Sequence, residues 1–217
     1  MAGKLIVFEG TEGGGKTSQM KRSHDWLKTQ LGDEVPILMT REPGGTALGV
    51  GLRQILLEED SLSLHHRAEL LLYAADRAQH VEEVLKPNLE KGAIILSDRY
   101  TDSTIAYQGY GRGISSSLIT KLNEIATGGL ESDLTIWLDV DVETGLKRAR
   151  KRGTADRMEQ ANLAFHQRVH QGFTELAKAY PQRIVRVDAN VSEIEVQQQI
   201  QEILRLRIGD WGLGTEN

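Results

Sequence analysis

One stretch near the N-terminus constrains the fold more than any other. Residues Gly10 to Thr17 read Gly-Thr-Glu-Gly-Gly-Gly-Lys-Thr, which matches the P-loop pattern G-x-x-x-x-G-K-[ST]. An apolar run precedes this loop, and a segment with helical periodicity, Ser18 to Leu31, follows it. Glycines let the backbone N–H groups surround a phosphate, and the positive end of the following helix lies at the same point. The order of strand, loop and helix therefore predicts a nucleotide-binding site rather than a flexible turn.

Two side chains of this loop have chemical roles of their own. Lys16 supplies a mobile positive charge for the β- and γ-phosphates, and the hydroxyl of Thr17 is placed to bind Mg²⁺. The residues that we predict to contact the donor nucleotide are Gly10, Thr11, Glu12, Gly13, Gly14, Gly15, Lys16, Thr17 and Ser18. The loop leaves open which molecule accepts the phosphate, so the acceptor must be sought in the rest of the chain.

Length, charge and cysteine content limit what the rest of the chain can do. With 217 residues the chain is long enough for one α/β domain with a substantial core. Its net charge of −5 does not favour nucleic acid as a partner, so an anionic substrate must be held by local arginines. Cysteine is absent, which excludes disulfides, thiolate metal sites and a cysteine nucleophile.

The sequence shows neither a signal-peptide pattern nor an apolar run near the roughly 20 residues that span a membrane. The chain starts almost directly on a candidate strand. We therefore expect a soluble, cytoplasmic protein that has no membrane partner.

Short apolar runs alternate with helical patterns along the chain. The predicted strands are Lys4–Glu9, Pro36–Thr40, Ala93–Ser97, Leu134–Leu138 and Ile184–Val187. This alternation predicts a five-stranded parallel sheet flanked by helices, and continuous apolarity fits strands buried on both faces. We therefore expect a single α/β domain of the P-loop NTPase type over residues 1–217. Residues 208–217 have the composition of a poorly ordered end.

Charged residues follow the predicted strands at their carboxyl ends, where ligands of such sheets bind. The residues in question are Arg41 and Glu42 after the second strand, Asp98 and Arg99 after the third, and Asp139 and Asp141 after the fourth. Asp98 can orient water around the Mg²⁺ ion, as Walker-B carboxylates do. Arg99, next to it, is placed for an acceptor phosphate.

Further along the chain, several side chains could recognise an acceptor. Tyr73 and Arg77 are four residues apart in a helical pattern, so both lie on one face, where they could hold a base and its carbonyl or phosphate. In isolation, a half-buried tyrosine with a surface arginine is the commoner arrangement. Gln108 carries both a donor and an acceptor, which can pair with the imide edge of thymine or uracil. Tyr107 could wall off the face of a sugar.

A dense basic run, Lys147 to Gly153, ends a predicted helix and is followed by Asp156 and Arg157. Such a run can bind nucleic acid, but the chain is acidic overall and basic residues also suit a helix C-terminus. We favour a small lid, at about residues 148–158, that closes over the nucleotide. Closure would bring arginines onto the transferring phosphoryl group and exclude water.

Two histidines, His166 and His170, lie four residues apart, a spacing that can bind zinc. However, Gln167 stands where the protease motif needs glutamate, and no third ligand is evident. We therefore interpret this pair as part of a solvated helix face.

Taken together and in this order, the motifs resemble bacterial thymidylate kinases. They are Phe8-Glu9-Gly10 with the P-loop, Thr-Arg-Glu-Pro-Gly-Gly at 40–45, Tyr-Ala-Ala-Asp-Arg at 73–77, Asp-Arg-Tyr at 98–100, Ala-Tyr-Gln-Gly at 106–109, and the arginine-rich segment that ends at Arg157. The likeness runs from about Lys4 to Val187. The P-loop alone is typical of a whole superfamily, whereas the second, fourth and fifth motifs at this spacing are specific to the family.

The resemblance implies phosphorylation of dTMP to dTDP by ATP with Mg²⁺, usually in a homodimer and without a nucleic-acid partner. The residues that it assigns to dTMP are Glu12, Glu42, Arg53, Tyr73, Arg77, Arg99, Thr104, Tyr107 and Gln108. By position, Tyr73 resembles the ring that stacks on thymine, while Arg77 and Gln108 resemble the residues that reach its carbonyl and its base edge. Thr104 is similar to a residue of the same pocket.

The resemblance also implies which residues bind the phosphate and the sugar of the acceptor. Arg53 and Arg99 resemble the phosphate clamp, with Glu42 nearby. Tyr107 resembles the wall under the deoxyribose that disfavours a 2′-hydroxyl, and Glu12 a carboxylate that approaches the acceptor sugar.

One departure divides this chain from part of the family, because its P-loop contains no arginine. The lid arginines are then expected to supply the missing charge, and we favour Arg152 and Arg157 because they flank the turn at Gly153. The predicted catalytic residues are Lys16, Arg99, Arg152 and Arg157, and the predicted metal ligands are Thr17 and Asp98. Two alternatives stay open: another P-loop kinase of nucleosides or nucleoside monophosphates, and a GTP- or ATP-dependent switch. The switch lacks support because no Asn-Lys-x-Asp run for reading guanine is present.

Overall fold

A computed structural model describes residues 3–58, 63–151, 153 and 157–213. Its sheet has five parallel strands in the order β2-β3-β1-β4-β5. The strands are β1 (Lys4–Glu9), β2 (Ile37–Arg41), β3 (Ile94–Asp98), β4 (Leu134–Asp139) and β5 (Ile184–Asp188). The predicted five-stranded parallel sheet is thus confirmed. Four strands end one residue later than predicted, on a charged residue that the sheet carries to its carboxyl edge.

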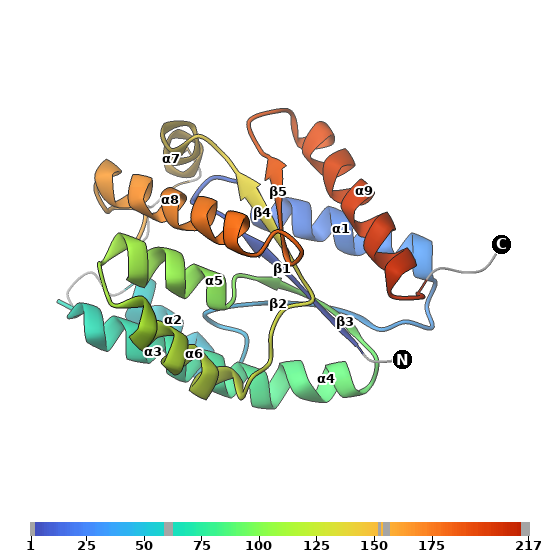
Figure 1. Cartoon of the computed structure of the whole chain (residues 1–217), viewed down its shortest axis with the longest axis horizontal. Helices are drawn as coiled ribbons and strands as arrows, with labels where there is room; N and C mark the ends of the chain where they lie inside the picture. Colours follow the sequence, from blue (N-terminus) through green and yellow to red (C-terminus); the bar gives the residue numbers. More distant parts are fainter. Residues whose placement is uncertain (1–2, 59–62, 152, 154–156, 214–217) are drawn as a thin grey trace.

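Helices connect the strands, and several of them continue into π-helical turns. They are α1 (Lys16–Leu31), α2 (Ala47–Arg53) with η1 (Gln54–Glu58), α3 (His66–His80) with η2 (Val81–Leu85), α4 (Lys86–Glu90), α5 (Thr101–Thr104) with η3 (Ile105–Gly111), α6 (Ser116–Thr127), α7 (Val142–Arg150), α8 (Leu163–Ala179) and α9 (Glu193–Asp210). Helices α1 and α9 cover one face of the sheet, and α3, α4, α5, α6 and α8 lie on the other (Figure 1).

Alternating side chains of the central strand β1 build the core on both faces, as the two-residue period of a strand requires. Ile6 and Phe8 pack with side chains of α1 and α9, whereas Leu5 and Val7 pack with side chains of η2. All four are fully buried. Because β1 lies in the middle of the sheet, the loop that follows it is held from both sides by neighbouring strands.

The predicted disorder of residues 208–217 is wrong for the part of this segment that the structure describes. Helix α9 continues to Asp210, Ile208 is buried, and Trp211 and Leu213 pack against the core beside α1 and α9. The Lys4 ammonium also lies 5.3 Å from the centre of the Trp211 ring. Apolar contacts of this kind hold Trp211 and Leu213 on the domain, and their position near the end of the sequence does not predict such contacts.

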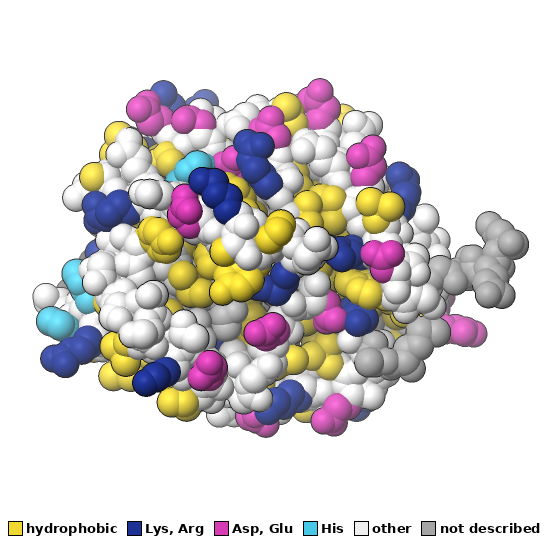
Figure 2. Space-filling model, in the orientation of Figure 1, with side chains coloured by type: hydrophobic (Ala, Val, Ile, Leu, Met, Phe, Trp, Pro, Cys, Tyr) yellow, Lys and Arg dark blue, Asp and Glu magenta, His cyan; other side chains and the backbone are white. Residues whose placement is uncertain are grey.

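None of the described helices combines the length and the apolarity that crossing a membrane requires. On the face drawn in Figure 2, positively and negatively charged side chains are interspersed rather than gathered into one basic area.

Candidate active site

The P-loop joins β1 to α1 and is packed tightly against α7. Gly13 has a φ of 69°, and a Cβ atom there would lie 2.0 Å from the carbonyl oxygen of Gly145. Only glycine fits this position, because the conformation and the space both exclude a side chain. The loop backbone is therefore fixed by its neighbour on α7 as well as by the strand before it.

Lys16 begins α1 and folds back over the loop. Its Nζ donates hydrogen bonds to the carbonyl oxygens of Gly10, at 3.0 Å, and Thr11, at 2.9 Å. Burial, followed by the positive charge of Arg99, lowers the pKa of Lys16 to about 8. The ammonium is thus held at the mouth of the loop, where an anion would restore its preference for the charged form.

Thr17 and Asp98, the two predicted metal ligands, lie side by side. The Thr17 hydroxyl donates to Oδ2 of Asp98 at 3.2 Å, because β1 and β3 are neighbours and both end at this edge. Hydroxyl and carboxylate oxygens are the hard ligands that Mg²⁺ prefers, usually with water and substrate phosphate completing its shell. In the described chain no cluster of three or more His, Asp or Glu side chains could hold a metal by itself. The pair fits a metal shared with a phosphate.

Arg99 occupies the turn after β3 in an unusual conformation, with a φ of 74°. The buried carboxylate of Glu9 stabilises this turn, because it accepts hydrogen bonds from the backbone N–H groups of Tyr100, at 2.9 Å, and Ser103, at 3.0 Å. The Arg99 guanidinium then donates to the carbonyl oxygen of Gly10 at 3.2 Å. The predicted phosphate-clamp arginine therefore lies directly against the P-loop.

Glu12, Tyr107 and Arg99 form one hydrogen-bonded group beside the loop. The Tyr107 hydroxyl donates to Oε1 of Glu12 at 2.6 Å, and Arg99 donates to the same oxygen at 3.3 Å and to the Tyr107 hydroxyl at 3.1 Å. Burial would raise the pKa of Glu12, but His166, Arg99, Lys16 and Tyr107 act in the opposite direction, and the pKa is lowered to about 2. Glu12 is therefore an ionised acceptor whose direction is fixed.

These groups line one cleft of about 980 Å³. The sheet order places β4 and β5 on one side of the P-loop and β3 and β2 on the other. On the first side the cleft is lined by Arg148, Ala189 and Val191; on the second, by Glu42, Arg77 and Gln108. The cleft therefore runs across the loop and offers space on both sides of it.

Arg77 is almost fully buried on the second side, at 2% exposure, and binds the predicted neighbours Glu42 and Thr104. Its Nε donates to Glu42 Oε2 at 2.8 Å, and its two terminal nitrogens donate to Thr104, Asn123 and the Tyr100 carbonyl oxygen at 2.9–3.0 Å. Four of the five N–H donors of a guanidinium are thus used within the described residues, and one is left for a ligand in the cleft.

His80, which supports this pocket from the protein interior, was missed by the sequence analysis. Its ring is fully buried, with Nδ1 2.8 Å from Oε1 of Glu42 and Nε2 2.7 Å from the hydroxyl of Thr40. Glu42 is therefore held between His80 and Arg77. The one sequence signal was spacing, since His80 lies three residues after Arg77 and so on the same face of α3.

Gln108 and the remaining predicted residues also reach the second side. Gln108 donates from Nε2 to Oε1 of Glu69 at 2.9 Å, and both side chains are buried. Arg53 donates to the carbonyl oxygen of Pro43 at 3.0 Å, and the half-buried Tyr73 packs against the cluster that contains Tyr107. Glu69 had no predicted role, although it holds Gln108 in place.

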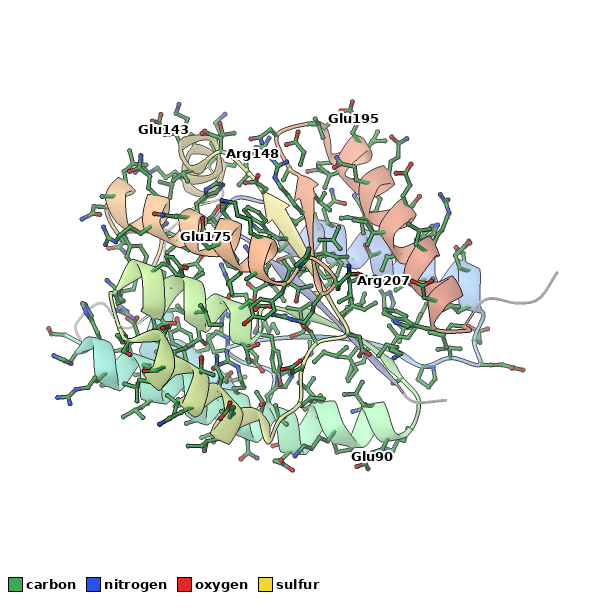
Figure 3. The ribbon with its side chains drawn as sticks, viewed as in Figure 1. Glu90, Glu143, Arg148, Glu175, Glu195 and Arg207 are labelled. Carbon is green, nitrogen blue, oxygen red and sulfur yellow. The ribbon has the colours of Figure 1, made fainter. Side chains whose placement is uncertain are left out.

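The lid arginines divide between the two sides of the cleft. Arg152 lies outside the described residues. Arg157 was predicted to touch the transferred phosphate, but the structure ties it to the second side, where it donates to the carbonyl oxygen of Leu56 at 2.8 Å and to Glu69 at 2.6 Å. Arg148 extends from α7 towards the ends of β4 and β5 (Figure 3) and donates to the carbonyl oxygen of Ala189 at 3.0 Å. Buried Glu69 attracts Arg157 away from the P-loop in this conformation.

The interpretation of His166 and His170 as a solvated helix face is wrong for His166, whereas the side chain of His170 is 31% exposed. His166 is fully buried, and its Nδ1 lies 3.3 Å from Oε2 of Glu12. His170 instead contacts Asp139, with its Nε2 2.6 Å from Oδ1. The two rings face different carboxylates, whereas two histidines that bind one zinc ion direct their ring nitrogens to the same point.

A phosphate loop that shares one cleft with a second pocket lined by arginines can hold two phosphorylated ligands end to end. This is the arrangement of a P-loop kinase, which passes a phosphoryl group between two bound molecules.

Comparisons with known proteins show to which family of P-loop kinases this chain belongs. A model of the family described as thymidylate kinase matches residues 8–200. The thymidylate kinase of Nostoc punctiforme is 63% identical over 210 residues, covering 96% of this chain and 98% of that one. The thymidylate kinase of Trichodesmium erythraeum is 56% identical over 224 residues, covering 97% and 99%. The crystal structure of thymidylate kinase from Ehrlichia chaffeensis superposes with a TM-score of 0.77 at 33% identity, covering 94% of this chain and all of that one. The chain belongs to the thymidylate kinase family.

Proposed function

We propose that this enzyme transfers the γ-phosphoryl group of ATP to dTMP and releases ADP and dTDP. The observation that supports this most directly is the position of Arg99, which contacts the P-loop backbone, Glu12 and Tyr107 within one cleft. Arg99 can therefore touch phosphates that enter from either side. A kinase needs this, because two anions must be brought into line before transfer.

The donor occupies the side of the cleft under α7. The backbone of residues 10–18 surrounds the β- and γ-phosphates of ATP, with Lys16 as their counter-charge. Thr17 and Asp98 would hold the Mg²⁺ ion, which would supply positive charge to neutralise the phosphates. Arg148, beside Ala189 and Val191, packs against the adenine base.

The acceptor base lies on the other side, among side chains of α3 and η3. Tyr73 stacks on thymine, and the remaining N–H of Arg77 donates to a thymine carbonyl. Gln108 uses Nε2 to bind Glu69, so its carbonyl oxygen is left to accept the N3–H of the base. Thr104 holds Arg77 in position at 2.9 Å.

The sugar and phosphate of dTMP lie between this pocket and the P-loop. Glu12 and Tyr107 line the sugar face, where their mutual hydrogen bond at 2.6 Å leaves little room for a 2′-hydroxyl. Arg53 and Arg99 bind the acceptor phosphate. Glu42, held between Arg77 and His80, fixes the turn after β2, whose Pro43 carbonyl oxygen accepts a hydrogen bond from Arg53.

No general base is needed, because the attacking phosphate oxygen is already anionic near neutral pH. The barrier is lowered by aligning two anions and by neutralising their charge with Lys16, Arg99, Mg²⁺ and lid arginines. Arg152 is our candidate among the lid arginines. A catalytic contact for Arg157 stays a prediction, and it requires that Arg157 leave Glu69.

We infer that the enzyme works as a homodimer through a surface on α2, α3 and α6, which lie side by side in Figure 1. Four apolar side chains there are strongly exposed: Leu48 (52%), Leu71 (57%), Leu118 (48%) and Ile125 (78%). Contiguous exposed apolar residues are typical of association surfaces. Light scattering should give the mass of a dimer for the wild type and of a monomer for Ile125→Arg. The control Ile194→Arg, at a position 66% exposed on α9, should stay dimeric; a monomeric wild type would refute the inference.

We also infer a cytoplasmic enzyme without a nucleic-acid partner, because its proposed substrates are free nucleotides and its net charge is −5. An assay of ADP release with Mg²⁺-ATP against dTMP, dUMP, dCMP, dGMP and AMP tests the proposed activity. We expect dTMP to give the highest kcat/KM. A preference for another acceptor would point to a different nucleotide kinase, and hydrolysis that is independent of any acceptor would point to a switch.

A further inference from the structure

Glu69 is a fully buried carboxylate in the first turn of α3, behind the base pocket and without a role in the transfer chemistry. Three side chains donate to it. Gln108 Nε2 donates to Oε1 at 2.9 Å, Arg157 to Oε2 at 2.6 Å, and Arg112 to both oxygens at 3.3 Å. Arg112 directly follows η3, and Arg157 lies in the predicted lid. Glu69 thus joins three separate parts of the chain at one point beside Gln108.

The charge of Glu69 decides how the Gln108 amide is turned. Burial would raise the pKa of Glu69, but the hydrogen bond from Gln108 and the charges of Arg112 and Arg157 outweigh it and lower the pKa. An ionised carboxylate only accepts hydrogen bonds, so it can bind the NH₂ end of Gln108 and not the carbonyl end. Gln108 lines the cleft, and no described residue donates to its carbonyl oxygen, so this oxygen is left for a ligand there.

We propose that Glu69 is a positioning residue for base selection: it locks Gln108 so that the pocket accepts bases with an N3–H and rejects cytosine. This inference rests on the proposed function. Thymine and uracil present an N–H at N3, which the Gln108 carbonyl can accept. Cytosine presents a bare nitrogen there, so two acceptors would face each other. Turning the amide would satisfy cytosine, but it would then set the Gln108 oxygen against the buried Glu69 carboxylate.

The test is Glu69→Gln, assayed with dTMP, dUMP and dCMP at saturating Mg²⁺-ATP. A glutamine can donate or accept, so Gln108 becomes free to turn either way. We expect the ratio of kcat/KM for dCMP to that for dTMP to rise about tenfold or more, because one buried mismatch is relieved. The dUMP to dTMP ratio should stay within about twofold, since uracil carries the same N3–H. Arg77 disfavours the cytosine amino group equally in the wild type and in the variant, so its effect cancels when their dCMP to dTMP ratios are compared.

Arg112→Met is the matched control, because it removes another partner of Glu69 and leaves the bond to Gln108 intact. Its dCMP to dTMP ratio should equal that of the wild type, even if its melting temperature falls. Should Glu69→Gln fail to fold by circular dichroism, Glu69→Asp replaces it. The aspartate keeps its charge near both arginines but is one methylene too short for Gln108, and the same ratio should rise.

These measurements distinguish a failure of the Glu69 assignment from a failure of the proposed function. A folded position-69 variant that keeps the wild-type ratio, or that changes all three substrates in parallel, overturns the assignment of Glu69. The same holds if Arg112→Met raises the ratio as much as Glu69→Gln does. A wild type that does not phosphorylate dTMP at all overturns the proposed function and this inference with it. The proposed function and the role of Glu69 are both supported if the wild type phosphorylates dTMP and Glu69→Gln raises the ratio of kcat/KM for dCMP to that for dTMP.

Discussion

Replacing Arg77 with methionine tests how the acceptor pocket is held together. Arg77→Met keeps the apolar stem but removes the partner of Glu42 Oε2, a carboxylate that is 4% exposed. Breaking a buried ion pair costs about 3–5 kcal/mol, because one charge stays buried without its partner. For a domain of this size each kcal/mol lowers Tm by about 2–4 °C. We therefore expect the melting temperature to fall by about 6–20 °C.

A double-mutant cycle separates the ion pair from the rest of the pocket. Glu42→Gln removes the charge that Arg77→Met would leave unpaired, so the double variant should be less destabilised than the sum of the single variants. We expect a coupling free energy of about 1–3 kcal/mol, measured by urea unfolding followed by circular dichroism. Single effects that add to within about 0.5 kcal/mol would show instead that Glu42 does not depend on Arg77.

Three further predictions concern the site itself. Lys16→Ala should remove most of kcat while leaving dTMP affinity largely intact; calorimetry that finds lost dTMP affinity with preserved turnover would contradict it. Because the pKa of Lys16 is lowered to about 8, its charge is lost as the pH rises through that value, so ATP affinity should weaken between pH 7 and 9.5 by up to tenfold per unit. A flat wild-type profile, or a slope that persists in Lys16→Arg, would speak against this. Gln108→Ala should weaken dTMP binding by about 1–3 kcal/mol and ATP binding much less, and equal losses would make Gln108 structural.

The fold was predictable because its signals are local. The P-loop identifies one strand and one helix, and the apolar runs identify the other strands to within a residue. Charged residues at the ends of these runs then fall at one edge of the sheet, as parallel topology demands. Thr17 and Asp98 could be paired in this way although 81 positions separate them.

The buried residues that support the site could not be predicted, because their signals are not local in the sequence. Glu69, His80 and His166 have ordinary surroundings in the sequence, and their roles depend on the distant residues that tertiary packing brings to them. Glu69 meets Gln108 from 39 positions away, and His80 meets Glu42 from 38. Arg157 shows the same limit, because Glu69, 88 positions earlier, captures it on the side of the cleft away from Arg148. A single sequence contains no record of such pairings.

In the proposed reaction, one cleft passes a phosphoryl group directly from ATP to dTMP. The most direct test of this transfer supplies ATP labelled with ¹⁸O in the γ-phosphoryl group, together with dTMP and Mg²⁺, and follows the nucleotides by mass spectrometry. We predict that labelled dTDP forms in equal amount to ADP, and that Lys16→Ala abolishes both. Labelled inorganic phosphate accompanied by unchanged dTMP would contradict direct transfer, because the phosphoryl group would then have gone to water.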